Sequence, residues 1–244
     1  MARGFREEDT ILNGIEIIGG MAVNGRNTSA RVAVCLCLDA SGSMTGHPIN
    51  ELNAGVRMFY DAVRKDDTAC SAVDISIVTF SGNREVKCIQ GFSQVFEIST
   101  PPSLTASGMT PMGEAVNFAL DLLEARKKEY QKSALEYYQP WLVLMSDGQP
   151  NGDQNTYNRA VERVRNMVNT KKLTIFAIGI GNEASREALS QFSPKRPPVK
   201  LKGLDFKKFF EWLSQSAHNI SVSKLGENVK LPPIDNWAEP WGIL

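Results

Sequence analysis

Histidine is scarce in this chain, with 2 residues among 244, and no two cysteines have C-x-x-C spacing. Protein zinc sites are built mainly from cysteine and histidine, so we do not expect one here. The four cysteines, Cys35, Cys37, Cys70 and Cys88, are interpreted as small apolar side chains in a reducing compartment. Cys35 and Cys37 lie two apart in a strand-like run, so they are not placed to bridge each other. These features indicate a cytoplasmic protein.

The sequence also lacks an excess of charge of one sign and a long apolar run. Basic and acidic residues number 27 each, which gives no electrostatic reason to expect binding to nucleic acid or a membrane surface. The longest apolar runs, VAVCLCL and LTIFAIGI, are far shorter than the roughly 20 residues that span a bilayer. The first residues, MARGFREEDT, lack the apolar core of a secretory signal. Neither nucleic acid nor a membrane is therefore an expected partner.

Apolar runs alternate with helical patterns along most of the chain. Strands buried on both faces are predicted where the runs are continuous, and helices where apolar residues recur at i, i+3, i+4 and i+7. One helix, whose apolar residues Val116, Ala119, Leu120 and Leu123 keep this spacing, is expected to extend toward residue 138, with its charged middle in solvent. The pattern predicts a doubly wound α/β fold, with a mostly parallel central sheet, helices on both faces and one short antiparallel edge strand. The expected strands are 31–38, 73–81, 85–89, 141–147, 173–181 and 199–202, and the other helices are 48–64, 155–171, 185–192 and 206–220.

The two ends fit this pattern less well. Residues 1–30 are interpreted as an N-terminal extension with one or two short strands that pair at a sheet edge. Residues 31–222 form the predicted single domain. Residues 223–244 contain Pro232-Pro233 and two tryptophans without periodicity, so an extended tail is expected there.

Oxygen-bearing side chains follow two of the predicted strands. The turn DASGSMTG follows the first buried strand, MSDGQPNG follows another, and SGMTPMGEA precedes a helix. Ligands of parallel sheets bind at the carboxyl ends of the strands, so these three turns are expected to share one rim. Hydroxyls and carboxylates suit Mg²⁺, Mn²⁺ or Ca²⁺. The predicted ligands are Asp39, Ser41, Ser43, Thr110 and Asp147.

These motifs resemble the metal-ion-dependent adhesion site of the von Willebrand factor type A family. The family pattern is D-x-S-x-S followed by a distant Thr and a distant Asp, and residues 31–222 carry every position in order. The resemblance implies that the two serines and the threonine contact the ion, that the aspartates often act through water, and that a partner Asp or Glu completes the shell. The combination of SGSM, TPMGEA and MSDGQP is similar to the bacterial tellurite-resistance (TerY) and YegL-like branch.

The resemblance implies a divalent-metal-dependent protein-binding scaffold and not an enzyme. Members of that branch tend to be encoded beside a protein phosphatase and a kinase-like protein, which are the implied partners in a bacterial stress-response or signalling complex. The alternative is a metal-dependent hydrolase acting on a phosphoester or similar substrate. A third alternative is a module without its ion that binds through a sheet edge or the tail.

Each residue of the site also has a plain structural interpretation when it is taken alone. Either aspartate can cap a helix, and the serines can satisfy turn amides. A serine-hydrolase site would need G-x-S-x-G, which is absent, and a histidine, for which only His47 and His218 exist. The segment GIGNEA (179–184) matches a dinucleotide fingerprint with Asp205 about 20 residues later. We interpret the glycines instead as a tight turn at a strand end, and Asp205 as the cap of the last helix.

Two further segments carry interaction hypotheses. A basic cluster is either a solvated face or a surface for an acidic or phosphorylated partner. The tail is expected to dock on its own domain, on a neighbouring copy or on a partner. If the tail reached the rim, Asp235 or Glu239 would occupy the open metal position and inhibit binding. The basic cluster is Lys195, Arg196, Lys200, Lys202, Lys207 and Lys208.

Overall fold

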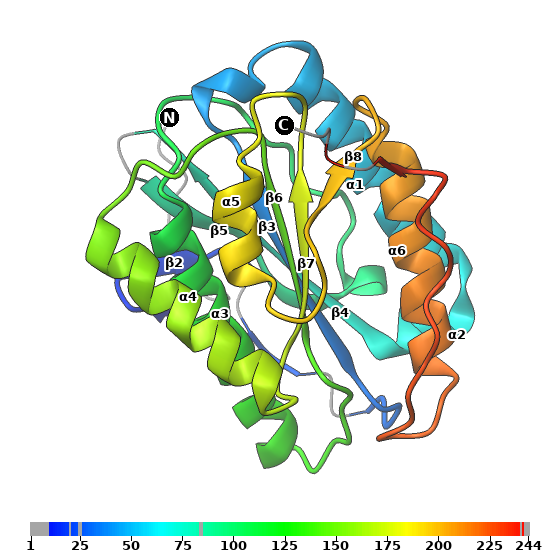
Figure 1. Ribbon diagram of the computed structural model, residues 1–244. Coiled ribbons are helices and arrows are strands. Elements are labelled where there is room, and N and C mark those ends of the chain that lie inside the picture. The colour runs from blue at the N-terminus through cyan, green and yellow to red at the C-terminus, as the bar shows by residue number, and fades with distance from the viewer. Residues whose placement is uncertain (1–9, 20, 24–25, 83–84, 240, 242–244) are drawn as a thin grey trace.

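A central sheet covered by helices on both faces forms the body of the protein (Figure 1). The computed structural model describes residues 10–19, 21–23, 26–82, 85–239 and 241. One face carries α3 (Met112–Lys132), α4 (Gln154–Asn169) and α5 (Arg186–Phe192). The other carries α1 (His47–Lys65), α2 (Asp67–Ala72) and α6 (Phe206–Ser221). The doubly wound α/β fold predicted from the sequence is confirmed.

The described part of the sheet contains nine strands in the order β1-β2-β5-β4-β3-β6-β7-β8-β9. The middle strands β4, β3, β6, β7 and β8 run parallel, and β5 is antiparallel to β4. Antiparallel pairs, β1 with β2 and β8 with β9, close the two edges. The strands are β1 (Thr10–Leu12), β2 (Ile15–Ile17), β3 (Val32–Asp39), β4 (Val73–Ser81), β5 (Glu85–Gln94), β6 (Trp141–Ser146), β7 (Thr174–Gly179), β8 (Val199–Leu201) and β9 (Ala238–Glu239).

The central strands are apolar on both faces because helices cover both sides. Every residue of β3 and β4 is buried. Alternate side chains enter two separate cores: Val34 and Leu36 pack on the α1 and α6 side, whereas Cys35 and Cys37 pack on the α3 side. The continuous apolar runs that predicted these strands are the sequence mark of this double coverage.

Three elements differ from the expectation. β5 continues to Gln94, beyond the predicted residues 85–89, and its second half, QGFSQ, gives no apolar alternation. The helix α3 ends at Lys132 and does not extend toward residue 138, since Ala134 adopts a positive φ of 52° that no helix can continue through. The short helix α2 was not predicted; Asp66 caps it by accepting a hydrogen bond from the Ala69 amide.

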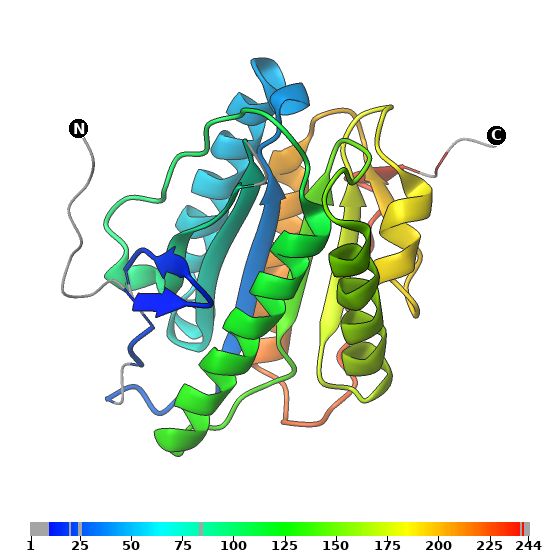
Figure 2. The same ribbon diagram turned by 90° about the vertical axis from the view of Figure 1, so that its left-hand side faces the viewer.

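The first and last described strands, β1 and β9, lie at opposite edges of the sheet (Figure 2). The N-terminal strands form a hairpin, and β2 pairs with β5 at Ile17. The tail runs back along α6 and adds β9 beside β8 (Figure 1). The expected short strands of the extension and the extended tail are thus both visible, and the assignment of 1–30, 31–222 and 223–244 as separate segments stays a prediction. Residues 1–9 and 242–244, which belong to that prediction, lie outside the described residues.

None of the helices in the described part of the chain combines the length and apolar character needed to span a membrane.

Candidate metal centre

Two neighbouring parallel strands bring the predicted aspartates to one rim of the sheet. Asp39 is the last residue of β3, and Asp147 follows directly on β6. The two strands pair in parallel, with Leu38 opposite Met145, so their carboxyl ends meet. Thr110 lies two residues before α3, which begins at Met112 near the same rim.

The carboxylate of Asp39 is buried and held at both oxygens. The Ser41 amide donates to Asp39 Oδ1 at 2.8 Å, and the Ser146 hydroxyl donates to Oδ2 at 2.5 Å. The first bond fixes the turn after β3, and the second ties that turn to the end of β6. Ser146 was not predicted from the sequence. Its position at the end of a strand, directly before Asp147, could have indicated its role.

A chain of oxygens links the serines to the second aspartate. The hydroxyls of Ser41 and Ser43 lie 3.0 Å apart, and the Ser43 hydroxyl donates to Asp147 Oδ1 at 2.9 Å. Ser41 is buried, while Ser43 is exposed. This chain of oxygens therefore runs from the buried side of the site to solvent, where a ligand can approach.

The loop that carries Thr110 is fixed by its backbone. Its amide donates to Asn151 Oδ1 at 2.7 Å, and its carbonyl accepts from the Asn151 amide at 3.1 Å. The Thr110 hydroxyl faces the loop after β6, since its oxygen lies 4.0 Å from where a Cβ on Gly148 would stand. Asn151 was missed by the sequence analysis because its role depends on a contact between two distant loops.

The same loop is joined to the turn after β3. The Gly42 amide donates to the Gly108 carbonyl at 2.9 Å, and the Ser107 amide donates to the Ala40 carbonyl at 2.8 Å. Gly108 has a φ of +64°, and a Cβ there would lie 2.4 Å from the backbone of Gly82. Only glycine fits this crossing, so SGMT is required to bring the threonine to the rim.

Glu114 fixes the third loop of the rim. Its Oε1 accepts from the Asp153 amide at 2.9 Å, and a Cβ on Gly152 would meet its Oε2 at 2.2 Å. The glutamate of TPMGEA thus holds the loop of MSDGQPNGD against α3. This gives the motif spacing a structural reason that the sequence alone did not show.

The electrostatics of the site favour a cation. Burial raises the pKa of Asp39 to about 6, an effect that the hydrogen bonds from Ser146 and Ser41 oppose and the nearby Asp147 reinforces. Burial also raises the pKa of Asp147. Among the described residues, neither carboxylate forms an ion pair with a lysine, arginine or histidine. A positive charge between the two would favour their ionised forms.

The spacing of the oxygens fits a small hard ion. Ligands of Mg²⁺ lie at about 2.0–2.1 Å in octahedral geometry, which puts neighbouring oxygens about 2.9 Å apart. The two links of the serine and aspartate chain measure 3.0 and 2.9 Å. Across the described residues, no group of three or more His, Cys, Asp or Glu could hold a metal, so hydroxyls are needed to complete the set. This donor set suits Mg²⁺, Mn²⁺ or Ca²⁺ and not zinc.

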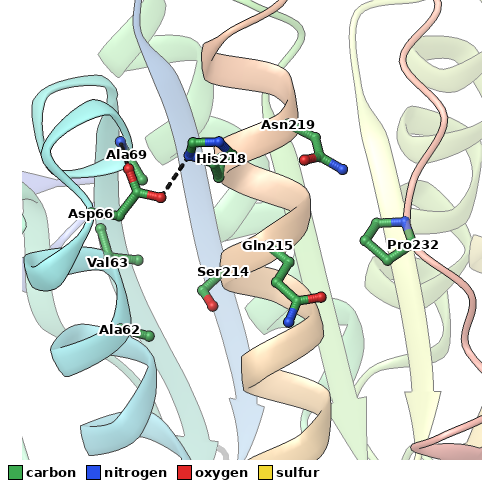
Figure 3. Close-up of a pocket in the computed structure, with 9 residues that line it drawn as sticks. All are labelled: Ala62, Val63, Asp66, Ala69, Ser214, Gln215, His218, Asn219 and Pro232. Carbon is green, nitrogen blue, oxygen red and sulfur yellow. Dashed lines mark hydrogen bonds and ion pairs between the residues drawn. The ribbon is translucent and has the colours of Figure 1, made fainter.

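The histidines lie outside this site. His47 starts α1 and is exposed. His218 on α6 forms an ion pair with Asp66 at 2.6 Å, beside a cavity of about 290 Å³ between α6 and the end of α1 (Figure 3). Asp66 follows α1, whose 19 residues span about 28 Å from the rim. His218 thus lies away from the rim, beside Asp66.

The glycine fingerprint at residues 179–184 has a structural cause. A Cβ on Gly179 would lie 2.4 Å from the ring of Trp241, and Gly181 has a φ of +70°. Asp205 caps α6 by accepting a hydrogen bond from the Lys208 amide at 3.2 Å. The tight turn and the helix cap explain this segment without a nucleotide.

Comparison with known proteins identifies the domain that this site belongs to. The family model described as von Willebrand factor type A domain matches residues 33–201. No curated protein matches the chain.

Solved structures share the fold at low sequence identity. The von Willebrand factor type A structure from Catenulispora acidiphila is 15% identical with a TM-score of 0.54, over 78% of this chain and 43% of that one. Proximal thread matrix protein 1 from the mussel byssus is 15% identical with a TM-score of 0.53, over 78% and 48%. The pilus adhesin SpaC from Lactobacillus rhamnosus GG is 12% identical with a TM-score of 0.61, over 78% and 31%. The chain thus spans less than half of these proteins, and the likeness is one of fold.

Proposed function

Because the chain belongs to the von Willebrand factor type A domain family, we propose that it is a divalent-metal-dependent protein-binding module. The observation that carries this proposal is the oxygen chain at the rim, in which Ser41, Ser43 and Asp147 are linked beside the buried Asp39. The proposed ligands of the ion are Asp39, Ser41, Ser43, Thr110 and Asp147, and the proposed ion is Mg²⁺, with Mn²⁺ or Ca²⁺ as substitutes.

Two carboxylates and three neutral hydroxyls leave an open place for a further anion. When bound, the ion would supply the positive charge that attracts a carboxylate of the partner. Neighbouring residues hold the proposed ligands in place: Ser146 and Ser41 orient Asp39, and Asn151 positions Thr110. The partner residue that fits is an Asp or Glu on a projecting loop.

We propose that the side chains and loops around the site select the partner. Met109 is 37% exposed beside Thr110, so an apolar group next to the partner's acid would find a contact there. The turn after β3, the loop that ends at Thr110 and the loop after β6 border the site. The earlier part of the loop after β5 does not, since Gln94 lies opposite Asp74 at the far end of β4.

We also propose a more specific assignment within the family. A TerY-like scaffold in a bacterial stress-response or signalling complex, with a phosphatase or kinase-like partner, agrees with the motifs SGSM, TPMGEA and MSDGQP. A cytoplasmic location agrees with four free cysteines, of which Cys35, Cys37 and Cys88 are buried.

The inhibitory role of the tail considered above stays a proposal. In the structure, Glu239 forms an ion pair with Lys200 of β8 at 3.0 Å. The tail docks on its own domain through Trp237, which is 2% exposed.

A metal-dependent hydrolase is the alternative function. It would need a general base beside the ion, and the described residues place no histidine there. Turnover of a generic phosphoester in Mg²⁺ or Mn²⁺ would establish it, and we expect none.

The proposed function predicts a chelator-sensitive set of partners. Immobilised protein is expected to retain specific proteins from a bacterial lysate in Mg²⁺, and to release them in EDTA. A Thr110→Val variant keeps the shape of the side chain but loses its hydroxyl, so it is expected to retain none of these proteins. The readout is mass spectrometry of the two eluates. Partners that bind equally well in EDTA, or to Thr110→Val, would contradict the proposal.

A further inference from the structure

The amino-terminal part of β7 has an edge that no strand covers in the described part of the chain. β8 pairs with β7 only at Ile178 and Gly179, so the residues before Ile178 face a space between α6, the loop after α5 and the tail. That space is a cavity of about 410 Å³. Its walls are mostly apolar and include Ile175, Phe176, Trp212, Leu231 and Trp237.

A second, more polar cavity of about 810 Å³ adjoins it at the amino ends of β6 and β7. Three lysines and one acid, Lys127, Lys171, Lys172 and Glu227, are among the residues that line this second space. Arg196, Val229 and Leu231 line both cavities, so the two spaces meet at these side chains. The result is an apolar chamber with a basic entrance.

Arg196 is the cation at the junction. Its guanidinium lies 5.3 Å from the centre of the Phe176 ring; the residue is exposed as a whole, and the partial burial of its side chain lowers the pKa of the guanidinium. Among the described residues, no carboxylate pairs with it, in contrast to Lys200 and Lys208 of the same basic cluster, which pair with Glu239 and Asp205. An arginine without an acid beside an apolar chamber has the charge and the fork geometry to take a carboxylate from outside.

We propose that this chamber binds a hydrophobic carboxylate, with its hydrocarbon part against β7 and Trp237 and its carboxylate on Arg196. The volume lies in the range of about 300–1,000 Å³ that is typical of small-molecule sites. An apolar cavity favours a hydrocarbon over water. The basic entrance selects an anion over a neutral lipid or a cation. The chamber lies along β7, two strands away from β3 in the sheet, and its entrance is at the amino ends of β6 and β7, opposite the end that carries Asp39. Binding there does not depend on the proposed metal.

Decanoate is a suitable probe because it can be titrated at concentrations well below the one at which it forms micelles. Trp212 and Trp237 line the chamber, so their fluorescence reports directly on occupancy. Decanoate, titrated into the full chain in EDTA, is expected to give a saturable fluorescence change and to raise the melting temperature. Decan-1-ol, which has the chain without the charge, is expected to bind about tenfold more weakly.

The variant Arg196→Gln is expected to raise the Kd for decanoate about tenfold or more and to leave decan-1-ol unaffected. Lys207→Gln removes an exposed cation of the same basic cluster that lines neither cavity, and it should bind decanoate as the wild type does. Val229→Phe, which enlarges a side chain at the junction, should weaken both ligands. Equal decanoate affinity in Arg196→Gln and wild type, or binding only at micellar concentration, would overturn the proposal.

Discussion

An Arg126→Met variant is expected to lose about 3–5 kcal/mol of its free energy of unfolding, because it leaves a buried carboxylate without its counter-ion. Arg126 is 1% exposed and lies in the carboxyl-terminal third of α3. Its Nε and Nη2 donate to Asp74 Oδ2 at 3.1 and 2.6 Å, and Asp74 has no exposed surface. Among the described residues, the other side chain that bonds to Asp74 is Tyr130, whose hydroxyl donates at 2.5 Å.

The same arginine ties the N-terminal segment to the domain. Its Nη1 donates to the carbonyls of Met21 and Ala22 at 2.8 and 3.1 Å. The methionine of the variant can fill the space beside Phe92 but cannot make these bonds. We therefore expect the hairpin of β1 and β2 to loosen, in addition to the global loss of stability.

Two further variants separate charge burial from packing. Lys127→Met removes a neighbouring cation whose partner, Glu124, is half-exposed, so it should cost less than about 1 kcal/mol. The double variant Asp74→Leu with Arg126→Met removes both charges and is expected to recover much of the loss. Urea unfolding of the set provides the measurement. A loss below about 1 kcal/mol in Arg126→Met would contradict this account of the buried pair.

A Trp237→Ala variant is expected to lose about 3–5 kcal/mol, the usual range for a large aromatic side chain removed from a core. The ring of Trp237 lies between Phe209 and Trp212 of α6, with centroid separations of 5.0 and 5.1 Å. Its carbonyl also accepts from the Lys202 amide at 2.8 Å, which holds β9 beside β8. Loss of the ring therefore releases the tail from α6 and from the sheet edge together.

Conservative and exposed replacements test this interpretation of the tail. The indole N–H of Trp237 is buried without a hydrogen-bond partner among the described residues, so Trp237→Phe should cost much less than Trp237→Ala. Leu225→Ala, at a side chain that is 41% exposed, should change stability by less than about 1 kcal/mol. Thermal and urea unfolding measure all three. An unchanged stability in Trp237→Ala would mean that the tail does not pack on α6 in solution.

The sequence predicted the central strands because their apolar runs are continuous and their ends are marked by acids or glycines. It also predicted the rim, since parallel strands that each end in an aspartate have their carboxyl ends on one side. The residues that hold the rim could not be found in this way. Asn151 and Glu114 act across loops that are distant in sequence, and their role depends on three-dimensional contacts.

Other features were hidden by local patterns that point elsewhere. Arg126 lies in a charged stretch of α3 that predicts solvent exposure, but its partner Asp74 is on β4, 52 residues away. The tail has no periodicity, so its docking depends on one tryptophan and a two-residue strand. These contacts are made by single residues against a folded surface, and no repeating pattern in the sequence marks them.

The most direct test of the metal centre is a set of thermal melts in excess EDTA and in millimolar Mg²⁺ on wild type and Asp147→Ala. An ion that binds only the folded state adds about 2.7 kcal/mol of stability at a hundredfold excess over its Kd. We predict this rise in wild type and none in Asp147→Ala. Asp153→Ala, which removes the cap of α4 beside the rim, should lower the baseline by about 1 kcal/mol but keep the rise. An equal rise in Asp147→Ala, or no rise in wild type with Mg²⁺, Mn²⁺ or Ca²⁺, would contradict the proposed site.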